Sequence, residues 1–389
     1  MQFPSRIHAE FWKFTGLLIA AILIHSLDYW NRPHSIASPQ GKWSAPALST
    51  SPRPIHWKLE AQGAVPMPDG MPVAHASNLL VMPANHPAAV TMFWFSGERE
   101  SAPNVEIAAS QYQRSTQQWT PARLVVNRFA IGSQLGWGIR RLGNPVPWLD
   151  SQGRIHLFIV ATGAGGWAAS RILHLRQTDP ANVLDSFQFE PVRVLPLSWF
   201  WNTSFLVRNT PLPLEDGGMM LPVHFELGIK YPVALRFDAE GNFSGMVRIS
   251  QRKYLLQPSF VMRSTTEWLA LMRHSYHGKI AVSRTTDAGL HWEDIPSLPL
   301  NNPDAAVAGL GLTSNNMLLL HNSSIGSRRV LDWSASTQGE DWQRVHNLAH
   351  GEKGNEFSYP ALAWHDADQR LWVSFTMNRQ HIAWQRFSP

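Results

Sequence analysis

Residues 285–292 read T-T-D-A-G-L-H-W and directly follow the strand-like run K-I-A-V-S-R. An Asp side chain accepts hydrogen bonds from backbone N–H groups two residues further on, and a Gly adopts the positive φ that a tight turn requires. The octet therefore predicts a hairpin turn with Trp292 packed beneath it. Because a single hairpin cannot bury its own apolar face, the turn also predicts neighbouring hairpins.

Six segments after residue 55 show the pattern expected of such neighbours, in which two short runs rich in apolar residues flank a turn-like centre. They are residues 79–95, 148–160, 212–223, 261–272, 312–321 and 364–375. Their centres recur about every 50 to 70 residues, which suits one four-stranded propeller blade each. Helical periodicity is scarce after residue 31.

A second octet, A-S-T-Q-G-E-D-W at residues 335–342, keeps the Gly and the Trp but has Thr337 where the Asp is expected. Weaker versions of the octet occur at residues 114–119 and 238–243. If there were one octet alone, unrelated turns in a β-sandwich would be the favoured explanation. Six hairpins with two octets in step favour a ring of blades instead. The sequence therefore predicts an all-β, six-bladed β-propeller over residues 56–389, preceded by an N-terminal hydrophobic helix.

The composition excludes several classes of function. The chain has 389 residues, 44% of them hydrophobic and 16% charged, so it can bury a large core and is not disordered. Its net charge of +5 comes from scattered Arg and Lys without a basic run, so we expect no nucleic-acid partner. There is no Cys, no H-E-x-x-H spacing and no phosphate-binding Gly loop, so neither a metal nor a cofactor is predicted.

The N-terminal segment predicts export. Residues 14–24 form an apolar run that is short for a bilayer-spanning helix and closer to the core of a secretory signal. No small-residue cleavage site follows at once, and residues 11–30 together would reach a full span with an aromatic end. Residues 1–30 are thus a cleaved signal peptide or a membrane anchor, with a buried soluble helix as a third reading. Residues 31–55 are a linker, and the propeller would be periplasmic or anchored to the inner membrane outside the cytoplasm.

The pattern S/T-x-D-x-G-x-x-W is the Asp-box, found in the sialidase (neuraminidase) superfamily and in other propellers. Further motifs occur in order: A-H-A-S (74–77), F-W-F-S-G (93–97), E-S-A-P-N (100–104), G-N-P (143–145), R-N-T-P (208–211), P-V-H-F-E (222–226), Q-P-S (257–259), N-P (302–303) and S-Y-P (358–360). This series resembles the divergent bacterial "predicted neuraminidase" branch of that superfamily over about residues 60–388. The resemblance implies an exo-acting glycosidase that acts on a glycan.

Sialidases that this chain resembles use a Tyr nucleophile primed by a Glu, an Asp acid/base and three Arg that bind the sugar carboxylate. The resemblance assigns the nucleophile to Tyr359 and the second Arg to Arg273. Arg328 or Arg329 matches the third Arg. Since alternate residues of a strand face opposite sides, only one of the pair can point inward, and Arg329 is slightly favoured.

The chain departs from the family pattern at three positions. His75 stands where the first Arg is expected, so the three-Arg clamp looks incomplete. Gln257 stands where the priming Glu is expected, and an amide cannot accept the phenol proton at neutral pH. Asn104 occupies a position that is commonly Asp in this branch.

A two-carboxylate mechanism is the alternative route to hydrolysis. Glu100 and Glu226 would form the pair, one protonating the leaving oxygen and the other activating water or attacking directly. We expect Glu226 to end a channel-facing inner strand. Trp94 or Trp201 would stack on sugar faces. Further substrate-binding candidates are His75, Asn144, Asn209, Gln257 and Asn302.

Three hypotheses for function follow. The first is an exported glycoside hydrolase acting on terminal acidic or deoxy sugars of a surface glycan. The second is a propeller that binds a glycan without cleaving it, which the departures at His75 and Gln257 favour. The third is a structural or assembly partner on the periplasmic face.

Overall fold

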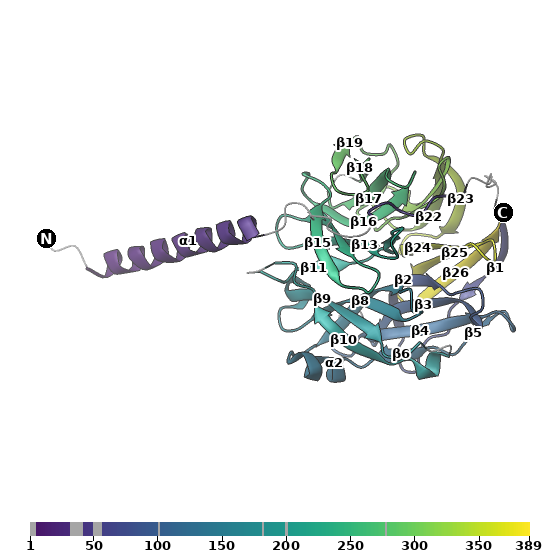
Figure 1. Ribbon diagram of the computed structural model, residues 1–389, viewed down its shortest axis with the longest axis horizontal. Helices are drawn as coiled ribbons and strands as arrows, with labels where there is room; N and C mark the ends of the chain where they lie inside the picture. Colours follow the sequence, from purple (N-terminus) through teal and green to yellow (C-terminus); the bar gives the residue numbers. More distant parts are fainter. Residues whose placement is uncertain are drawn as a thin grey trace.

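The computed structural model describes residues 5–31, 42–49, 57–99, 102–180, 183–198, 201–276 and 278–389. The long helix α1 (Ser5–Asn31) lies apart from the sheets (Figure 1). Among the described residues, no helix combines the length and the apolar character needed to cross a membrane.

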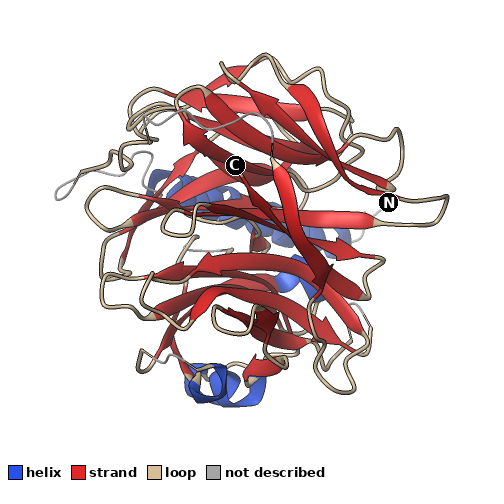
Figure 2. Ribbon diagram, turned by 90° about the vertical axis from the view of Figure 1, so that its right-hand side faces the viewer, coloured by secondary structure: helices blue, strands red, loops and turns tan. Residues whose placement is uncertain are grey.

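The rest of the described chain is mostly strand (Figure 2) and forms six antiparallel sheets, which we number as blades 1 to 6. Blade 1 contains β2 (Val73–Val81), β3 (Ala88–Gly97), β4 (Glu106–Gln113), β5 (Gln118–Trp119) and β6 (Arg123–Val126). Blade 2 contains β7 (Arg141–Leu149), β8 (Ile155–Thr162), β9 (Ser170–Gln177) and β10 (Phe189–Val194). Blade 3 contains β11 (Phe205–Val207), β12 (Leu212–Pro213), β13 (Met219–Phe225), β14 (Tyr231–Phe237) and β15 (Phe243–Arg248).

Blade 4 contains β16 (Leu255–Met262), β17 (Trp268–His274), β18 (Ile280–Thr285) and β19 (Glu293–Ile295). Blade 5 contains β20 (Ala308–Thr313), β21 (Asn316–Asn322), β22 (Val330–Ser336) and β23 (Gln343–His350). Blade 6 contains β24 (Phe357–His365), β25 (Arg370–Met377), β26 (His381–Ser388) and β1 (Lys58–Ala64). The short helices α2 (Arg128–Leu135), η1 (Gly166–Ala169) and η2 (Leu184–Ser186) lie in the connections.

The six sheets close into a ring. The inner strand β2 contacts β7 on one side and β24 on the other, and β20 contacts both β16 and β24. Strand β1, from the start of the propeller, pairs with β26 at its end, so the last blade is built from both ends of the domain. The predicted six-bladed propeller is therefore confirmed, and each predicted hairpin is the start of one blade.

The first octet adopts the predicted turn. The Thr285 hydroxyl donates to Asp287 Oδ1 (2.8 Å) and accepts from the Gly289 N–H (3.0 Å). Gly289 has a φ of +85°, which a side chain would disfavour. The Trp292 indole N–H donates to the Gly289 carbonyl (3.1 Å), so the Trp closes the loop from below.

The second octet recovers its missing carboxylate from another position. Asp341, which directly precedes Trp342, accepts hydrogen bonds from the hydroxyls of Ser336 and Thr337. These hydrogen bonds hold the pKa of Asp341 below its ordinary value. Trp342 Nε1 donates to the Gly339 carbonyl (2.8 Å), as its counterpart does in the first octet. The turn therefore tolerates Thr337 in place of the expected Asp, because Asp341 supplies the carboxylate that accepts these hydrogen bonds.

Four inner strands carry a β-bulge at a corresponding place, and in three of them the bulge contains an X-Pro pair. Strands β2, β7, β16 and β24 each shift register near their first residues. Each bulge contains a non-Gly residue with positive φ: Ala76 (+54°), Asn144 (+45°), Gln257 (+52°) and Tyr359 (+52°). Such conformations cost ~1 to 3 kcal/mol each and occur preferentially at functional sites. The bulges therefore mark one end of the propeller axis as the place to look for a site.

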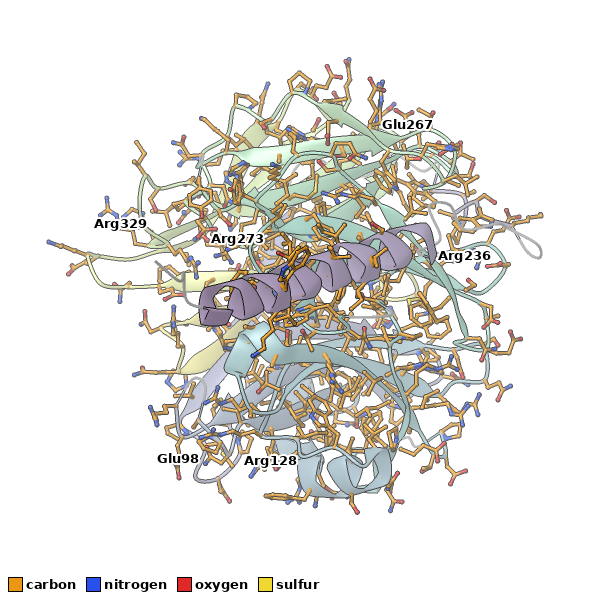
Figure 3. All side chains as sticks on the ribbon, turned by 90° about the vertical axis from the view of Figure 1, so that its left-hand side faces the viewer. Glu98, Arg128, Arg236, Glu267, Arg273 and Arg329 are labelled. Carbon is orange, nitrogen blue, oxygen red and sulfur yellow. The ribbon has the colours of Figure 1, made fainter. Side chains whose placement is uncertain are left out.

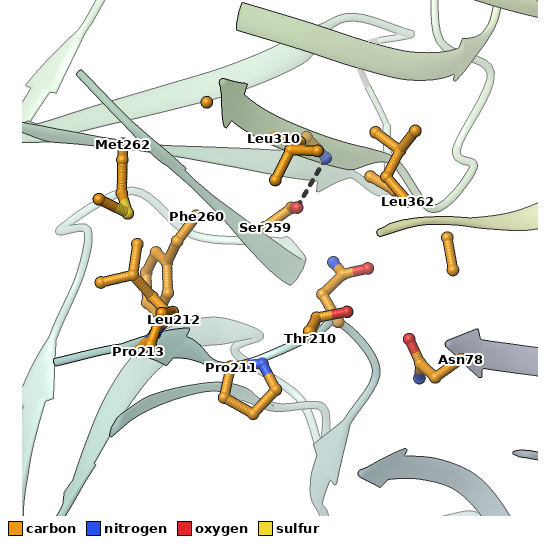
Figure 4. A pocket seen from close by; sticks show the side chains of 15 residues that line it. Asn78, Thr210, Pro211, Leu212, Pro213, Ser259, Phe260, Met262, Leu310 and Leu362 are labelled. Atoms are coloured by element: carbon orange, nitrogen blue, oxygen red, sulfur yellow. Dashed lines mark hydrogen bonds between the residues drawn. The ribbon is translucent and has the colours of Figure 1, made fainter. Parts of the chain in front are cut away.

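The centre of the ring also holds a cavity of about 90 Å³ between the inner strands of several blades (Figure 4). Its lining is largely apolar and includes Phe260, Leu310 and Leu362, with a hydrogen bond from the Gly309 N–H to Ser259 Oγ (2.9 Å). Ligand pockets are usually larger than about 300 Å³. This cavity is thus too small for a sugar.

Candidate functional site

Tyr359 is the centre of a polar cluster at the bulged ends of the inner strands. Its ring packs edge-on against the imidazole of His75, with 4.4 Å between ring centroids and 73° between planes. The guanidinium carbon of Arg208 lies 5.2 Å from the centroid of the same ring. These three residues come from blades 6, 1 and 3, so the closed ring brings together side chains that are far apart in the sequence.

Arg208 is a buried cation, only 1% exposed. Its Nη1 and Nη2 donate to the carbonyls of Ser77 (3.3 Å) and Pro360 (2.9 Å), and no carboxylate of the described residues forms an ion pair with it. Burial lowers the pKa of Arg208 to about 10, which leaves it charged at neutral pH. The R-N-T-P motif does not by itself predict a role for Arg208, because the burial of this side chain depends on closure of the ring.

Arg273 also lies in the cluster. Its Nε donates to Asp304 Oδ1 (2.5 Å) and its Nη1 to Gln257 Oε1 (3.2 Å). Burial alone would lower the pKa of Arg273, but the hydrogen bond to Asp304 and the negative charges of Asp304 and Glu226 raise it above its ordinary value. Arg273 is therefore held by Asp304 and Gln257, and the charge of Glu226 acts on it.

Arg328, and not Arg329, is the arginine that enters the cluster. Arg328 Nη1 pairs with Glu356 Oε1 (3.1 Å) and its Nη2 donates to the Asp304 carbonyl (2.8 Å). Arg329 is exposed at the surface (Figure 3). The preference for Arg329 is thus wrong, because both residues precede β22 (Val330–Ser336) and strand alternation does not govern them.

Glu226 follows the expected strand, but that strand is not the inner strand of its blade. It follows β13, the second strand of blade 3, and its N–H donates to the Ser204 carbonyl (2.9 Å). The contact with His224 (3.5 Å between Nε2 and Oε2) lowers the pKa of Glu226 to about 2, against the effect of burial and with help from Lys230 and Arg273. A carboxylate with this pKa is ionised at neutral pH and cannot serve as a general acid.

Glu100 lies outside the described residues, so its predicted role stays a prediction. The two candidate sugar-stacking tryptophans differ sharply in exposure. Trp94 is completely buried and belongs to the core, which corrects its assignment as a stacking residue. Trp201 is 47% exposed, so its proposed role stays a prediction.

The asparagines predicted to bind hydroxyl groups have structural hydrogen bonds instead. The Asn144 amide donates to the Val207 carbonyl (3.1 Å), and the Asn209 amide donates to the carbonyls of Gln257 (3.0 Å) and Pro258 (2.9 Å). The Asn302 amide donates to the Ala305 carbonyl (2.7 Å). Asn144 and Asn209 therefore tie neighbouring inner strands together, and Asn302 fixes its own loop. The amide oxygen of Gln257 likewise accepts a hydrogen bond from Arg273.

His75 does not replace the missing arginine as a cation. It is 3% exposed and also packs edge-on against Phe95 (5.4 Å between centroids). Burial, followed by the positive charge of Arg379, lowers the pKa of His75 from 6.5 to about 3. The imidazole is therefore neutral at pH 7.

The buried neutral His75 predicts a loss of stability in acid. Between pH 6.5 and about 3 the unfolded chain binds a proton at this residue and the folded chain does not, so stability falls as pH falls. We expect this residue to contribute a slope of up to about 1.4 kcal/mol per pH unit. Urea unfolding of wild type and His75→Phe at pH 7, 6, 5 and 4 measures the difference. Parallel pH profiles for the two proteins would contradict the assignment.

Among the described residues, no group of three or more His, Asp or Glu side chains is placed to hold a metal ion.

Comparisons with known proteins agree with this architecture. Residues 89–371 match the family model for the BNR repeat-like domain. No curated protein sequence matches the chain. Among solved structures, the Hadza microbial sialidase Hz136 aligns with a TM-score of 0.64 at 17% identity, over 81% of this chain and 65% of that one.

A Trypanosoma rangeli sialidase aligns with a TM-score of 0.62 at 11% identity, over 83% of this chain and 57% of that one. A protein of unknown function from Dyadobacter fermentans aligns with a TM-score of 0.65 at 14% identity, over 85% of this chain and 99% of that one. At these identities the likeness shows the fold, and the chain spans less than two thirds of either sialidase. The family model, in contrast, covers most of the sequence, and the chain therefore belongs to the BNR repeat-like domain family, with a sialidase-like propeller.

Proposed function

We propose that the protein is an exo-acting glycoside hydrolase that removes terminal acidic or deoxy sugars from a surface or extracellular glycan. The observation that carries this proposal is the polar cluster at the bulged ends of the inner strands, where Tyr359 packs against His75 and Arg208. Arg273 hydrogen-bonds to Gln257 in a neighbouring bulge, and the charge of Glu226 acts on Arg273. A phenol, an ionised carboxylate and a guanidinium are the groups that displacement at a sugar carbon and recognition of an acidic sugar require.

The charge states divide the roles between these groups. Because Glu226 is ionised at neutral pH, it acts as a base or a nucleophile, or stabilises positive charge on the sugar. The leaving oxygen needs a proton, and Glu100 is our candidate for that acid. Negative charge that develops on Tyr359 would be stabilised by Arg208 beside its ring and by Arg273.

A propeller that binds a glycan without cleaving it is the second candidate. Three observations favour it. Gln257 has an amide and not a carboxylate, so it cannot take the phenol proton, and its amide oxygen already accepts a hydrogen bond from Arg273. His75 is neutral, so blade 1 supplies no cation at that position.

Hydrolysis of chromogenic sialyl and uronyl glycosides separates the two functions. We expect the wild type to cleave at least one of them, and Glu226→Gln or Glu100→Gln to lower kcat/KM by about 10² to 10⁴-fold. Glu240→Gln is the matched control, because Glu240 is an exposed turn carboxylate of the same blade as Glu226. If the wild type bound the glycan but hydrolysed no glycoside above the rate in buffer alone, the hydrolase proposal would be wrong and the glycan-binding propeller would be favoured.

A further inference from the structure

Arg379 brings a fourth guanidinium to the cluster, from a turn that no sequence motif singled out. It lies between β25 and β26, in the hairpin at the end of blade 6. Its carbonyl accepts a hydrogen bond from the Ala74 N–H (3.1 Å), one residue before His75. The turn is thus attached to blade 1 at the position where the resemblance implies the first arginine.

The backbone of this turn favours Gly where the chain has Arg379. Asn378 and Arg379 have φ values of +53° and +58°, the two successive positive values of a type I′ hairpin turn. Asn-Gly is the preferred pair in such turns, since a Cβ is disfavoured at the second position. A strained residue kept where Gly would serve the fold better points to a function for its side chain.

The Arg379 side chain is fixed in place by Glu356. Arg379 Nε pairs with Glu356 Oε2 (2.9 Å), while Arg328 pairs with the other oxygen, Oε1 (3.1 Å). Asn378 clamps the same residue from both sides: its Oδ1 accepts from the Glu356 N–H (2.9 Å) and its N–H donates to the Glu356 carbonyl (2.7 Å). Glu356 therefore holds two guanidinium groups side by side.

The charge of Arg379 also affects the pKa of His75. After burial, the charge of Arg379 is the largest influence that lowers the pKa of His75. Burial would raise the pKa of Glu356, but the hydrogen bond from Arg379 and the charge of Arg328 hold it below its ordinary value, so Glu356 is ionised. The charge of Arg379 therefore acts at the position where His75 itself is neutral.

The cluster as described carries more positive than negative charge. Its cations are Arg208, Arg273, Arg328 and Arg379, and its carboxylates are Glu226, Asp304 and Glu356. An excess positive charge at a partly buried site favours an anionic ligand. A sugar carboxylate suits it best, because guanidinium groups bind carboxylates with two parallel hydrogen bonds.

We propose that Arg379 is a specificity-determining residue that, together with Arg273 and Arg328, binds the carboxylate of an acidic sugar. Glu356 positions Arg328 and Arg379 for this contact from beneath. The inference rests on the proposed function for its substrate class, and it adds a residue from blade 6 in place of the arginine that blade 1 lacks.

Binding of N-acetylneuraminic acid and glucuronic acid, each compared with its methyl ester by titration calorimetry, tests the inference. We expect Arg379→Gly to bind the better acid roughly tenfold to a hundredfold more weakly than wild type, because a hydrogen-bonded charge is lost. Affinity for the methyl ester should be equal in both proteins. The midpoint of thermal unfolding should not fall, since Gly suits the turn, and Arg379→Lys should be intermediate.

Two variants serve as controls. Gln369→Gly removes a positive-φ side chain (φ +53°) from the other turn of β25, and Arg123→Gln removes an exposed charge from the outer edge of blade 1. Both should bind the acid as the wild type does. Equal binding of the acid by wild type and Arg379→Gly would overturn the inference, and so would a wild type that binds neither acid.

The same titration keeps this inference distinct from the proposed function. A protein that cleaves no glycoside but binds the acid through Arg379 would end the hydrolase proposal and leave the role of Arg379 standing. If the protein cleaved glycosides and neither cleavage nor acid binding depended on Arg379, the hydrolase proposal would stand and the role of Arg379 would be wrong.

Discussion

Tyr359→Phe is expected to lower kcat by about 10³-fold or more on whichever glycoside the wild type cleaves. The substitution removes only the phenol oxygen. The ring keeps its contacts with His75 (4.4 Å between centroids) and with the guanidinium of Arg208 (5.2 Å), so the site should keep its shape. Steady-state kinetics measure the loss, and it should appear in kcat, because the oxygen is needed for the displacement itself and much less for binding.

The matched control is Tyr112→Phe. Tyr112 packs among Trp119, Trp372 and Trp384 between blades 1 and 6, away from the cluster, and its hydroxyl makes long hydrogen bonds (3.3 and 3.4 Å) to described residues. That variant should turn over as the wild type does. If Tyr359→Phe kept more than a tenth of the wild-type kcat, Tyr359 would not be the nucleophile, and Glu226 would take that role.

Trp268→Ala should lower the free energy of unfolding by about 3 to 5 kcal/mol. Trp268 is completely buried between blades 3 and 4, in a cluster that includes Met220, Phe260 and Ala288. A side chain at Gly289 of the first octet would come within 2.8 Å of its ring, so the tryptophan fills the space directly beneath that turn. Urea unfolding followed by fluorescence measures the loss.

Trp201→Ala is the comparison for this prediction. Trp201 is 47% exposed, and substitutions at such surface positions usually change stability by less than about 0.5 kcal/mol. A loss below about 1 kcal/mol for Trp268→Ala would mean that the blades are not held together by packing at the octets.

The fold was predictable because hairpin turns and apolar runs are local features. The octet at residues 285–292 specifies its own hydrogen bonds, and six hairpins at blade-sized intervals leave few architectures. The second octet shows the limit of this reasoning. Asp341 replaces the missing carboxylate from a position that the pattern does not include, since only the folded loop brings it to the hydroxyls of Ser336 and Thr337.

The site was predictable only in part. Motif matching found Tyr359 and Arg273, whose places depend on the inner strands that the motifs mark. It missed Arg208 and Arg379, because their positions depend on closure of the ring and on a turn in the last blade. It also assigned ligand contacts to Asn144 and Asn209, whose amides instead hydrogen-bond to the inner strand of the next blade. The export segment at residues 1–30 stays a prediction.

A crystal structure of the wild type soaked with N-acetylneuraminic acid or glucuronic acid tests most directly whether this cluster binds sugars. We expect one sugar ring against Tyr359, with its carboxylate on Arg273 and within hydrogen-bond distance of Arg328 or Arg379. Sugar bound elsewhere on the propeller, or a cluster that stays empty at saturating concentrations of both acids, would contradict the account.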